Sequence, residues 1–454
     1  MSIFIILIFI YIALSIFVIN YPEYIVPGIL LLSPLERFNI NIGFSLTPII
    51  AFLPICLLSI FVNYQKISFS DITSNFYIFM STLLIFLSVL VSCLFSINKF
   101  ISFKSLFYIV LSIVYFYISY ISVIYFCKFR TIIYSIFLML LMISSYGFFQ
   151  YIIFLIHGFS AFKMITVLHS NSINPNAFTI ILFGVRFLRP DSTFSDVNTA
   201  SGFVGFFIPI LFMFIIFSKY FRKNFHKTII TIFYIISVLT MLYFILTFSK
   251  ASFLAVIFGL MFLFLYYRLY KHKLILVLLF TIVLGVIFVI TKVLFSHNIG
   301  SFLAAQEYSF RIHLILSLYA LKIFLKYPIF GSGLSTFTYY FGLYIKPLIN
   351  YPLNNIGNPP LFLLWLSELG FVGFLSYILF IISYFKVLFV NISAKFQRIK
   401  LLRHISVGFI AGMISLIVSN LFHSYFTLIF IWAFLGIILG ILRFKKIVEV
   451  GEYS

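Results

Sequence analysis

Three short polar motifs interrupt a strongly apolar chain, and their residue types suit the binding of a concentrated anion. The motifs are RPDSTFSDVN at 189–198, TFSKAS at 247–252 and PIFGSGLSTF at 328–337. Arginine binds phosphate oxygens through a planar fork and stays charged, whereas lysine offers a single point charge. We therefore expect Arg189 and Arg311 to bind an anion, with Lys250 as a third cation.

Smaller residues in these motifs could contact the same ligand. Gly331 and Gly333 would allow backbone N–H groups to approach an anion, although a simple turn explains the same pair. Asn198 and Ser249 carry side chains that hydrogen-bond polar groups of a ligand or, equally, nearby backbone. We expect these four residues to line a substrate site.

A hydroxyl that acts as a nucleophile must lose its proton to a nearby carboxylate or histidine. Asp196 and Glu368 are the carboxylates that we favour for catalysis. Each carboxylate could instead have a structural role, because Asp196 could cap the following helix and Glu368 could pair with Arg311. The remaining acid–base candidates are Asp191, Glu307, His297, His313 and His423.

The elements that position these residues must lie in lipid. Hydrophobic residues make up 64% of the 454 and charged residues 9%, against roughly 45–50% and 25% in soluble domains. This composition excludes a soluble enzyme. The net charge of +21 is scattered between apolar runs, so we expect no nucleic-acid partner. Cys56, Cys93 and Cys127 show neither metal-ligand nor disulfide spacing, and we expect no metal.

Apolar runs long enough to cross a bilayer occur about twelve times. They span 2–20, 43–63, 75–96, 104–126, 131–156, 199–218, 228–248, 251–269, 274–295, 361–389, 404–422 and 425–442. Residues 24–32 are apolar but too short, which favours a re-entrant or interfacial piece. The sequence therefore predicts an all-α, polytopic helix bundle that forms one membrane domain over 1–454.

Lysine and arginine gather in the connections that follow even-numbered spans. These basic segments are 128–130, 219–227, 268–273, 395–403 and 443–446, and Lys99 with Lys104 after the third span is the exception. Because basic loops stay inside, we expect both termini in the cytoplasm and the polar motifs outside. The longest outward loop, about 296–360, contains an apolar helical spacing at 308–327 that predicts an amphipathic helix on the membrane surface.

In this order, the motifs resemble those of the O-antigen ligase and O-antigen polymerase superfamily, which are glycosyltransferases of the bacterial envelope. The family pattern R-x-x-G/S-T-F-x-D-x-N, T-x-S-R/K, R, P-x-x-G-x-G and E-x-G-x-x-G is matched over roughly 185–375, which would be the family core. The resemblance implies a helix bundle in the bacterial inner membrane with one large periplasmic loop. It also implies glycan transfer from a polyprenyl-pyrophosphate carrier to an acceptor sugar hydroxyl, without a metal or other cofactor.

One family element is missing. The His-Asn pair that precedes the E-x-G motif would fall at Pro359-Pro360, where only Asn358 is close. This absence favours a polymerase-like member, whose acceptor is another lipid-linked repeat unit, over a ligase, whose acceptor is lipid A core. The missing histidine also leaves the general base unassigned, and His423 is one candidate to replace it. A polymerase would have a chain-length regulator protein as its partner.

Two other classes of protein fit parts of the sequence. A flippase or other transporter of lipid-linked oligosaccharides agrees with about twelve helices, but transporters usually contain internal repeats, and none is visible here. A membrane scaffold would not require Arg189, Lys250 and Arg311 to converge. We therefore expect Arg189 and Arg311 to lie close together beside a cavity open to the outer leaflet.

Overall fold

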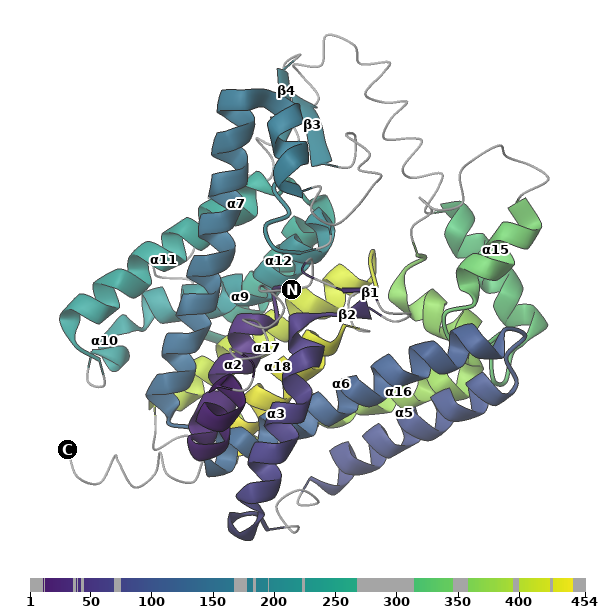
Figure 1. Cartoon of the computed structure of the whole chain (residues 1–454), viewed down its shortest axis with the longest axis horizontal. Helices are drawn as coiled ribbons and strands as arrows, with labels where there is room; N and C mark the ends of the chain where they lie inside the picture. The colour runs from purple at the N-terminus through teal and green to yellow at the C-terminus, as the bar shows by residue number, and fades with distance from the viewer. Residues whose placement is uncertain are drawn as a thin grey trace.

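The computed structural model describes residues 11, 13–35, 38, 40–41, 45–68, 75–166, 178–182, 185–194, 196–222, 225–267, 314–345, 358–394, 400–424 and 428–443. Most of these residues are helical, and two short hairpins supply the strands (Figure 1). The first hairpin pairs β1 (Ile40–Asn41) with β2 (Ser45–Leu46), and the second pairs β3 (Thr179–Leu182) with β4 (Val185–Leu188). An all-α membrane architecture is confirmed for this part of the chain.

The helices follow one another with short connections. After a helix at Ala13–Asn20 come η1 (Pro22–Tyr24), α2 (Ile25–Leu32), α3 (Pro48–Val62), η2 (Tyr64–Lys66), α5 (Phe76–Leu94), α6 (Lys99–Tyr125), α7 (Phe129–Thr166), α9 (Val197–Ile216) and α10 (Ser218–Phe221). Then follow α11 (Lys227–Leu246), α12 (Lys250–Tyr267), a helix at 314–326, α15 (Phe337–Ile345), α16 (Leu361–Ala394), α17 (Lys400–Asn420) and α18 (Ile429–Arg443).

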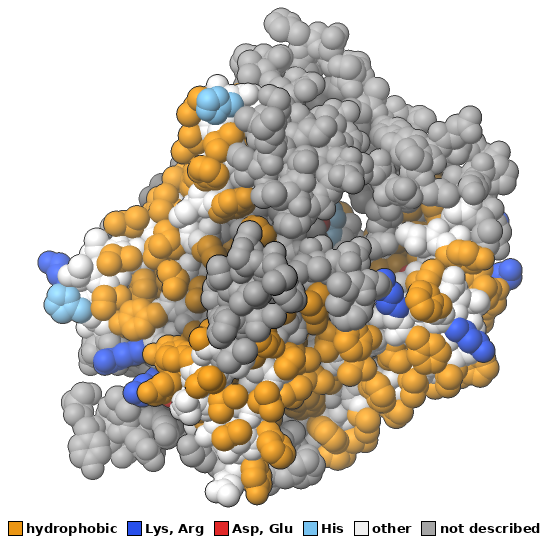
Figure 2. All heavy atoms as spheres, in the orientation of Figure 1, with side chains coloured by type: hydrophobic (Ala, Val, Ile, Leu, Met, Phe, Trp, Pro, Cys, Tyr) orange, Lys and Arg blue, Asp and Glu red, His pale blue; other side chains and the backbone are white. Residues whose placement is uncertain are grey.

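Eight helices within the described residues are long and apolar enough to cross a membrane, or nine if one bent pair counts as a span. They correspond to the predicted spans from 75–96 to 251–269, at 361–389 and at 404–422. The predicted spans 43–63 and 425–442 are helices of only 15 residues each, and 274–295 lies outside the described residues. Figure 2 shows hydrophobic side chains covering the visible faces of α5, α6 and α7, as contact with lipid requires.

Side-chain contacts sort the helix ends into two groups. At one end, the turn between α5 and α6 meets the 328–333 loop, because Ser102 Oγ donates to Leu334 O at 2.9 Å. At the other end, Ser68 N donates to Tyr125 OH at 2.9 Å, and His404 Nδ1 lies 2.6 Å from Tyr267 OH. We call the first group the site end. It contains the three polar motifs and the described parts of the connections that follow the third, fifth, seventh and eleventh predicted spans, including Lys99 and Lys104.

The N-terminal helix runs in the direction opposite to that expected. Tyr11 OH donates to Ala51 O at 3.0 Å, and Ser59 Oγ donates to Val18 O at 2.9 Å, so this helix lies parallel to α3. Residue 11 is therefore at the site end and residue 20 at the other. A bend of 110° separates Ala13–Asn20 from Pro22–Leu32 and returns the chain to the site end. The residues before 11 lie outside the description, and a cytoplasmic N-terminus stays a prediction.

Glycines let two helices approach at backbone distance. Gly436 and Gly440 of α18 face α6, where a Cβ on Gly436 would overlap the carbonyl oxygen of Phe116, and one on Gly440 would meet Val123. This spacing of small residues four apart is a frequent contact between membrane helices, because it maximises van der Waals packing where lipid offers no hydrophobic drive.

Replacing Gly436 with leucine should therefore destabilise the folded chain. The side chain would have to push α6 away from α18, and overpacking of this kind typically costs about 1–3 kcal/mol. The melting temperature of the purified chain in detergent measures the effect. Gly205→Ala is a milder comparison, since its Cβ would meet the side-chain atoms Val256 Cγ2 at 3.3 Å and Phe244 Cε2 at 3.4 Å and would overlap no backbone. Equal melting temperatures for the two variants would contradict this packing.

Candidate functional site

Arg189 joins the first two motifs. It follows β4, and its backbone N–H donates to Phe178 O at 2.8 Å, which continues the hairpin. Its Nε donates to the backbone oxygen of Thr247 at 2.9 Å, and its Nη2 donates to Asn198 Oδ1 at 3.3 Å. The guanidinium thus lies between the start of α9 and the turn that connects α11 and α12.

Hydroxyl groups continue this cluster into the helices. Ser249 Oγ donates to Asn198 Oδ1 at 3.4 Å and to Ser252 Oγ at 3.2 Å. Ser252 Oγ lies 2.8 Å from Ser201 Oγ, which links α12 to α9. The structure therefore brings together three of the predicted site residues, Arg189, Asn198 and Ser249.

Asp196 caps α9. Its Oδ1 accepts hydrogen bonds from the backbone N–H groups of Asn198 at 2.8 Å and Thr199 at 3.0 Å, and its Oδ2 accepts one from the Thr199 hydroxyl. An aspartate at this position satisfies N–H groups that have no partner within the helix. The geometry favours the capping role over the role of general base that we expected.

A buried glutamine fixes the backbone of the first motif. Gln150 of α7 has no exposed surface; its Oε1 accepts from Ser192 N at 2.8 Å, and its Nε2 donates to Asp191 Oδ1 at 2.9 Å. Its Nε2 also donates to Ser192 O at 3.1 Å. Sequence analysis missed Gln150, although a lone amide side chain in an apolar span was a usable signal.

The third motif lies across a break in α16. Gly370 has φ 66° and ψ −167°, which interrupts the helix and frees its peptide groups. Ser332 N donates to Ser367 O at 3.0 Å, Gly333 N to Glu368 O at 3.0 Å and Phe371 N to Pro328 O at 2.8 Å. A Cβ at Gly331 would overlap the backbone of Glu368. The glycines of this loop thus permit close backbone contact, and their predicted role of approaching an anion is not what the described contacts show.

Glu368 connects this loop to the next helix. Its Oε2 accepts from Ser335 N at 2.8 Å and its Oε1 from Phe337 N at 3.1 Å, so the carboxylate holds the start of α15. The side chain is 5% exposed. Ser92 of α5 donates to its backbone oxygen at 2.8 Å. Each carboxylate oxygen can accept a further hydrogen bond, which leaves Glu368 able to act on a ligand.

Uncommon backbone conformations mark all three motifs. Within the described residues, the non-glycine residues with positive φ are Ser192 at 54°, Phe248 at 49° and Ser335 at 59°. Each belongs to or directly follows a different motif. Such conformations cost free energy and persist where the surrounding contacts enforce them, which happens often at functional sites. Their distribution is an independent reason to locate the site here.

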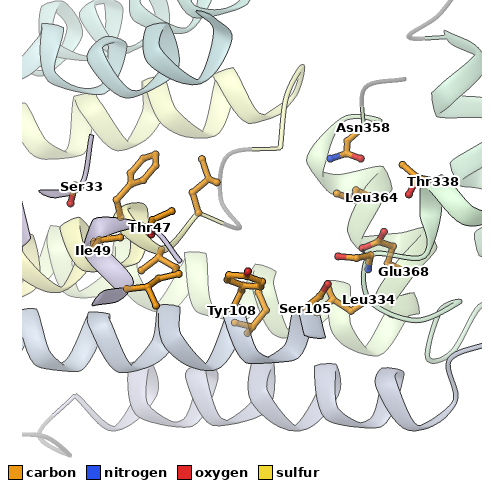
Figure 3. A pocket seen from close by; sticks show the side chains of 16 residues that line it. Ser33, Thr47, Ile49, Ser105, Tyr108, Leu334, Thr338, Asn358, Leu364 and Glu368 are labelled. Carbon is orange, nitrogen blue, oxygen red and sulfur yellow. Dashed lines mark hydrogen bonds between the residues drawn. The ribbon is translucent and has the colours of Figure 1, made fainter. Parts of the chain in front are cut away.

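A cavity of about 380 Å³ lies at the site end beside Glu368 (Figure 3). In Figure 3, Glu368, Thr338 and Asn358 lie on one side and Ile49 and Thr47 on the other, with Tyr108 and Ser105 of α6 between them. Phe430 also lines the cavity, and its ring packs on Phe194 of the first motif at 5.9 Å between centroids. The cavity therefore lies beside the Glu368 loop, and Phe430 links its lining to the first motif.

Residues 314–345 form a small lobe with its own core above α16. Leu316, Ala320 and Ile323 of the 314–326 helix pack with Phe337 and Tyr340. The opposite face of this helix exposes a row of leucines, at positions 314, 318, 321 and 325. The helix covers the described part of the predicted amphipathic segment 308–327.

Lys250 begins α12 with an exposed side chain. Arg311 lies outside the described residues, so its expected proximity to Arg189 remains a prediction. His423 follows α17, where Asn358 Nδ2 donates to the neighbouring Ser424 Oγ at 3.4 Å. Among the described side chains, no group of three or more His, Cys, Asp or Glu residues could hold a metal ion.

Comparison with known proteins adds one match. Residues 235–378 match the family model described as O-antigen ligase. The matched segment contains the second and third motifs and Glu368, whereas Arg189 and the first motif precede it. No curated protein matches the chain.

Proposed function

We propose that this chain transfers a glycan from a polyprenyl-pyrophosphate carrier to a sugar hydroxyl, as the match of residues 235–378 to the O-antigen ligase family model supports. The observation that carries the proposal is the position of three polar motifs at one end of a membrane bundle, where Arg189 joins the first two and the third lies beside a cavity with Glu368. A lipid-linked sugar needs this arrangement, since its carrier stays in the bilayer while its reacting carbon is at the surface.

The reaction requires one bond to form and one to break at the anomeric carbon of the donor. The acceptor hydroxyl oxygen bonds to this carbon, the bond to the pyrophosphate oxygen breaks, and the electron pair leaves with the polyprenyl pyrophosphate. Arg189 stabilises the charge that grows on the leaving oxygen; one such donor is worth about 2.7–4 kcal/mol. Glu368 takes the hydroxyl proton. Arg311 and Lys250 are further cations for the pyrophosphate, and Asn198 and Ser249 orient Arg189.

The site end faces the outside of the inner membrane in this proposal. The basic connections 128–130, 219–227 and 395–403 follow helices at the other end, as the positive-inside rule requires. The missing histidine before Glu368 supports a polymerase, which extends lipid-linked repeat units, over a ligase that uses lipid A core. A chain-length regulator would then be a partner in the membrane.

Reconstitution tests the proposal directly. The full chain in liposomes receives a polyprenyl-pyrophosphate oligosaccharide with a fluorescent label on its sugar. We expect longer labelled glycans and released polyprenyl pyrophosphate, both separated by chromatography, without added metal. Liposomes without protein are the control. If the label crosses the bilayer with no new glycosidic bond, the chain is a transporter and the proposal is wrong.

A further inference from the structure

Aromatic rings gather where the ends of α9, α12 and α17 meet, at the end of the bundle opposite the site end. The buried His404 of α17 stacks on Phe217, which follows α9, with 3.9 Å between the ring centroids. Its centroid lies 5.0 Å from that of Tyr220 in α10, and its Nδ1 lies 2.6 Å from Tyr267 OH at the end of α12. We call these four residues, with the neighbouring Tyr266, the aromatic cluster.

Two exposed cations lie on the rim of the aromatic cluster. Lys219 Nζ lies 5.1 Å from the centre of the Tyr220 ring. Arg403 Cζ lies 5.9 Å from the centre of the Tyr266 ring, and its Nε donates to Tyr266 OH at 3.3 Å. Ring faces of this kind attract cations and hold them in place. The two terminal nitrogens of Arg403 have no hydrogen-bond partner among the described residues, and such a guanidinium edge can bind two oxygens of one phosphate.

The segments that form this region contain no acidic residue that could pair with the two cations. Every residue of the aromatic cluster, and both cations, belong to the segments 197–306 and 369–448, and neither segment contains an aspartate or a glutamate. The helices that meet here, α9, α10, α12 and α17, lie within the same segments. An anion that pairs with Lys219 and Arg403 therefore has to come from outside these four helices.

The position of the aromatic cluster indicates the class of this anion. The ends of spanning helices lie at the level of the lipid headgroups, where tyrosine is frequent because its ring is apolar and its hydroxyl polar. Below the cluster, α12 exposes Phe258, Met261 and Leu265 on one face, and Leu265 directly precedes Tyr266. A ligand that matches both features carries a phosphate and long apolar chains, as an anionic phospholipid does.

We propose that Lys219 and Arg403 bind the headgroup phosphate of an anionic phospholipid, whose acyl chains lie along the exposed face of α12. Arg403 binds the phosphate oxygens through its terminal nitrogens, and Lys219 supplies the second positive charge. His404 holds the site together, because it stacks on Phe217 and contacts Tyr267 from a third helix. This lipid site is separate from the cavity beside Glu368, and the proposal does not depend on glycan transfer.

Native mass spectrometry of the delipidated full chain in detergent measures this binding. Phosphatidylglycerol is the probe, and phosphatidylcholine with the same acyl chains is the comparison, because its headgroup carries no net charge. We expect the chain to bind phosphatidylglycerol at least about fivefold more tightly, since each nearby lysine or arginine contributes roughly this factor. Excess inorganic phosphate should not displace the lipid. Equal binding of the two lipids, or complete displacement by inorganic phosphate, would overturn the proposal.

Single substitutions locate the lipid at the aromatic cluster. Lys219→Ala and Arg403→Ala should each weaken phosphatidylglycerol binding about fivefold and leave phosphatidylcholine binding unchanged. Lys386→Ala is the matched control, because Lys386 is also exposed and lies 4.3 Å from the centre of a tyrosine ring, that of Tyr77, but on α16. It should bind phosphatidylglycerol as the parent does. An equal loss in all three variants would show diffuse attraction and would remove the site.

Thermal stability in detergent provides a second measurement. A lipid that binds only the folded chain raises its melting temperature. Phosphatidylglycerol should raise the melting temperatures of the parent and Lys386→Ala more than those of Lys219→Ala and Arg403→Ala. The same rise in all four proteins would contradict the site. Neither measurement involves glycan transfer, so an inactive chain that binds the lipid would refute the proposed function alone.

Discussion

Arg189→Ala should lower the rate of glycan transfer by about 10²–10³-fold, because the growing charge on the leaving oxygen loses its donor. Arg189→Lys should recover little of this rate. Lysine keeps the charge but cannot bond Thr247 O and Asn198 Oδ1 while it also faces a phosphate oxygen. The measurement is the initial rate of polyprenyl pyrophosphate release in liposomes.

An arginine far from the site provides the control for the loss of one positive charge. Arg222 is exposed beyond α10 at the end opposite the site, and Arg222→Ala should transfer glycan at the parent's rate. Melting temperatures show whether Arg189→Ala remains folded. A folded Arg189→Ala variant within about threefold of the parent's rate would contradict the role of the guanidinium.

Glu368→Gln should reduce transfer by about 10²–10⁴-fold, the usual contribution of a general base. The amide retains one oxygen for the N–H groups of Ser335 and Phe337 but cannot accept a proton. The parent's rate should fall as the pH falls, since the carboxylate must be ionised to act. The residual rate of Glu368→Gln should lack this fall, and a pH–rate profile measures the difference.

The pH profile distinguishes a base from a residue that only holds α15. A purely structural Glu368 would lower the melting temperature and leave the shape of the profile unchanged. Glu23→Gln, at the end opposite the site, is the matched control and should keep the parent's rate and profile. An unaltered profile in Glu368→Gln would show that another group takes the proton.

The sequence predicted most of the helices and the common end at which the three motifs lie, because both depend on local patterns. Apolar runs define spans, and each span reverses the chain, so the odd-numbered connections must meet at one end. Lys99 and Lys104 show that counting Lys and Arg does not assign every connection to the correct end of the bundle. The turn that holds them lies at the site end, where Ser102 bonds the third motif. The predicted direction of the first helix was wrong, because hydropathy does not reveal the bend near Pro22.

The detailed roles of the site residues were harder to predict, because they depend on contacts between distant segments. Gln150 and Ser192 are 42 positions apart, and Ser92 and Glu368 are 276 apart. No spacing rule relates such pairs. Asp196 shows the converse case. Its capping role depends only on the next three residues, and this role was one of the two interpretations that the sequence allowed. Local chemistry is visible in a sequence, whereas a site assembled across helices is not.

The break at Gly370 lets the backbone of the 328–333 loop lie directly against the backbone of residues 367–371. Its hydrogen bonds join Ser332 N to Ser367 O and Phe371 N to Pro328 O, so peptide groups hold the loop in place. The side chain of Ile329 takes no part in these bonds and is exposed. Homologous chains could therefore carry different residues at position 329 and keep the same backbone here. Positions 331 and 370 must remain glycine, because a Cβ at either one would overlap the backbone of the other segment.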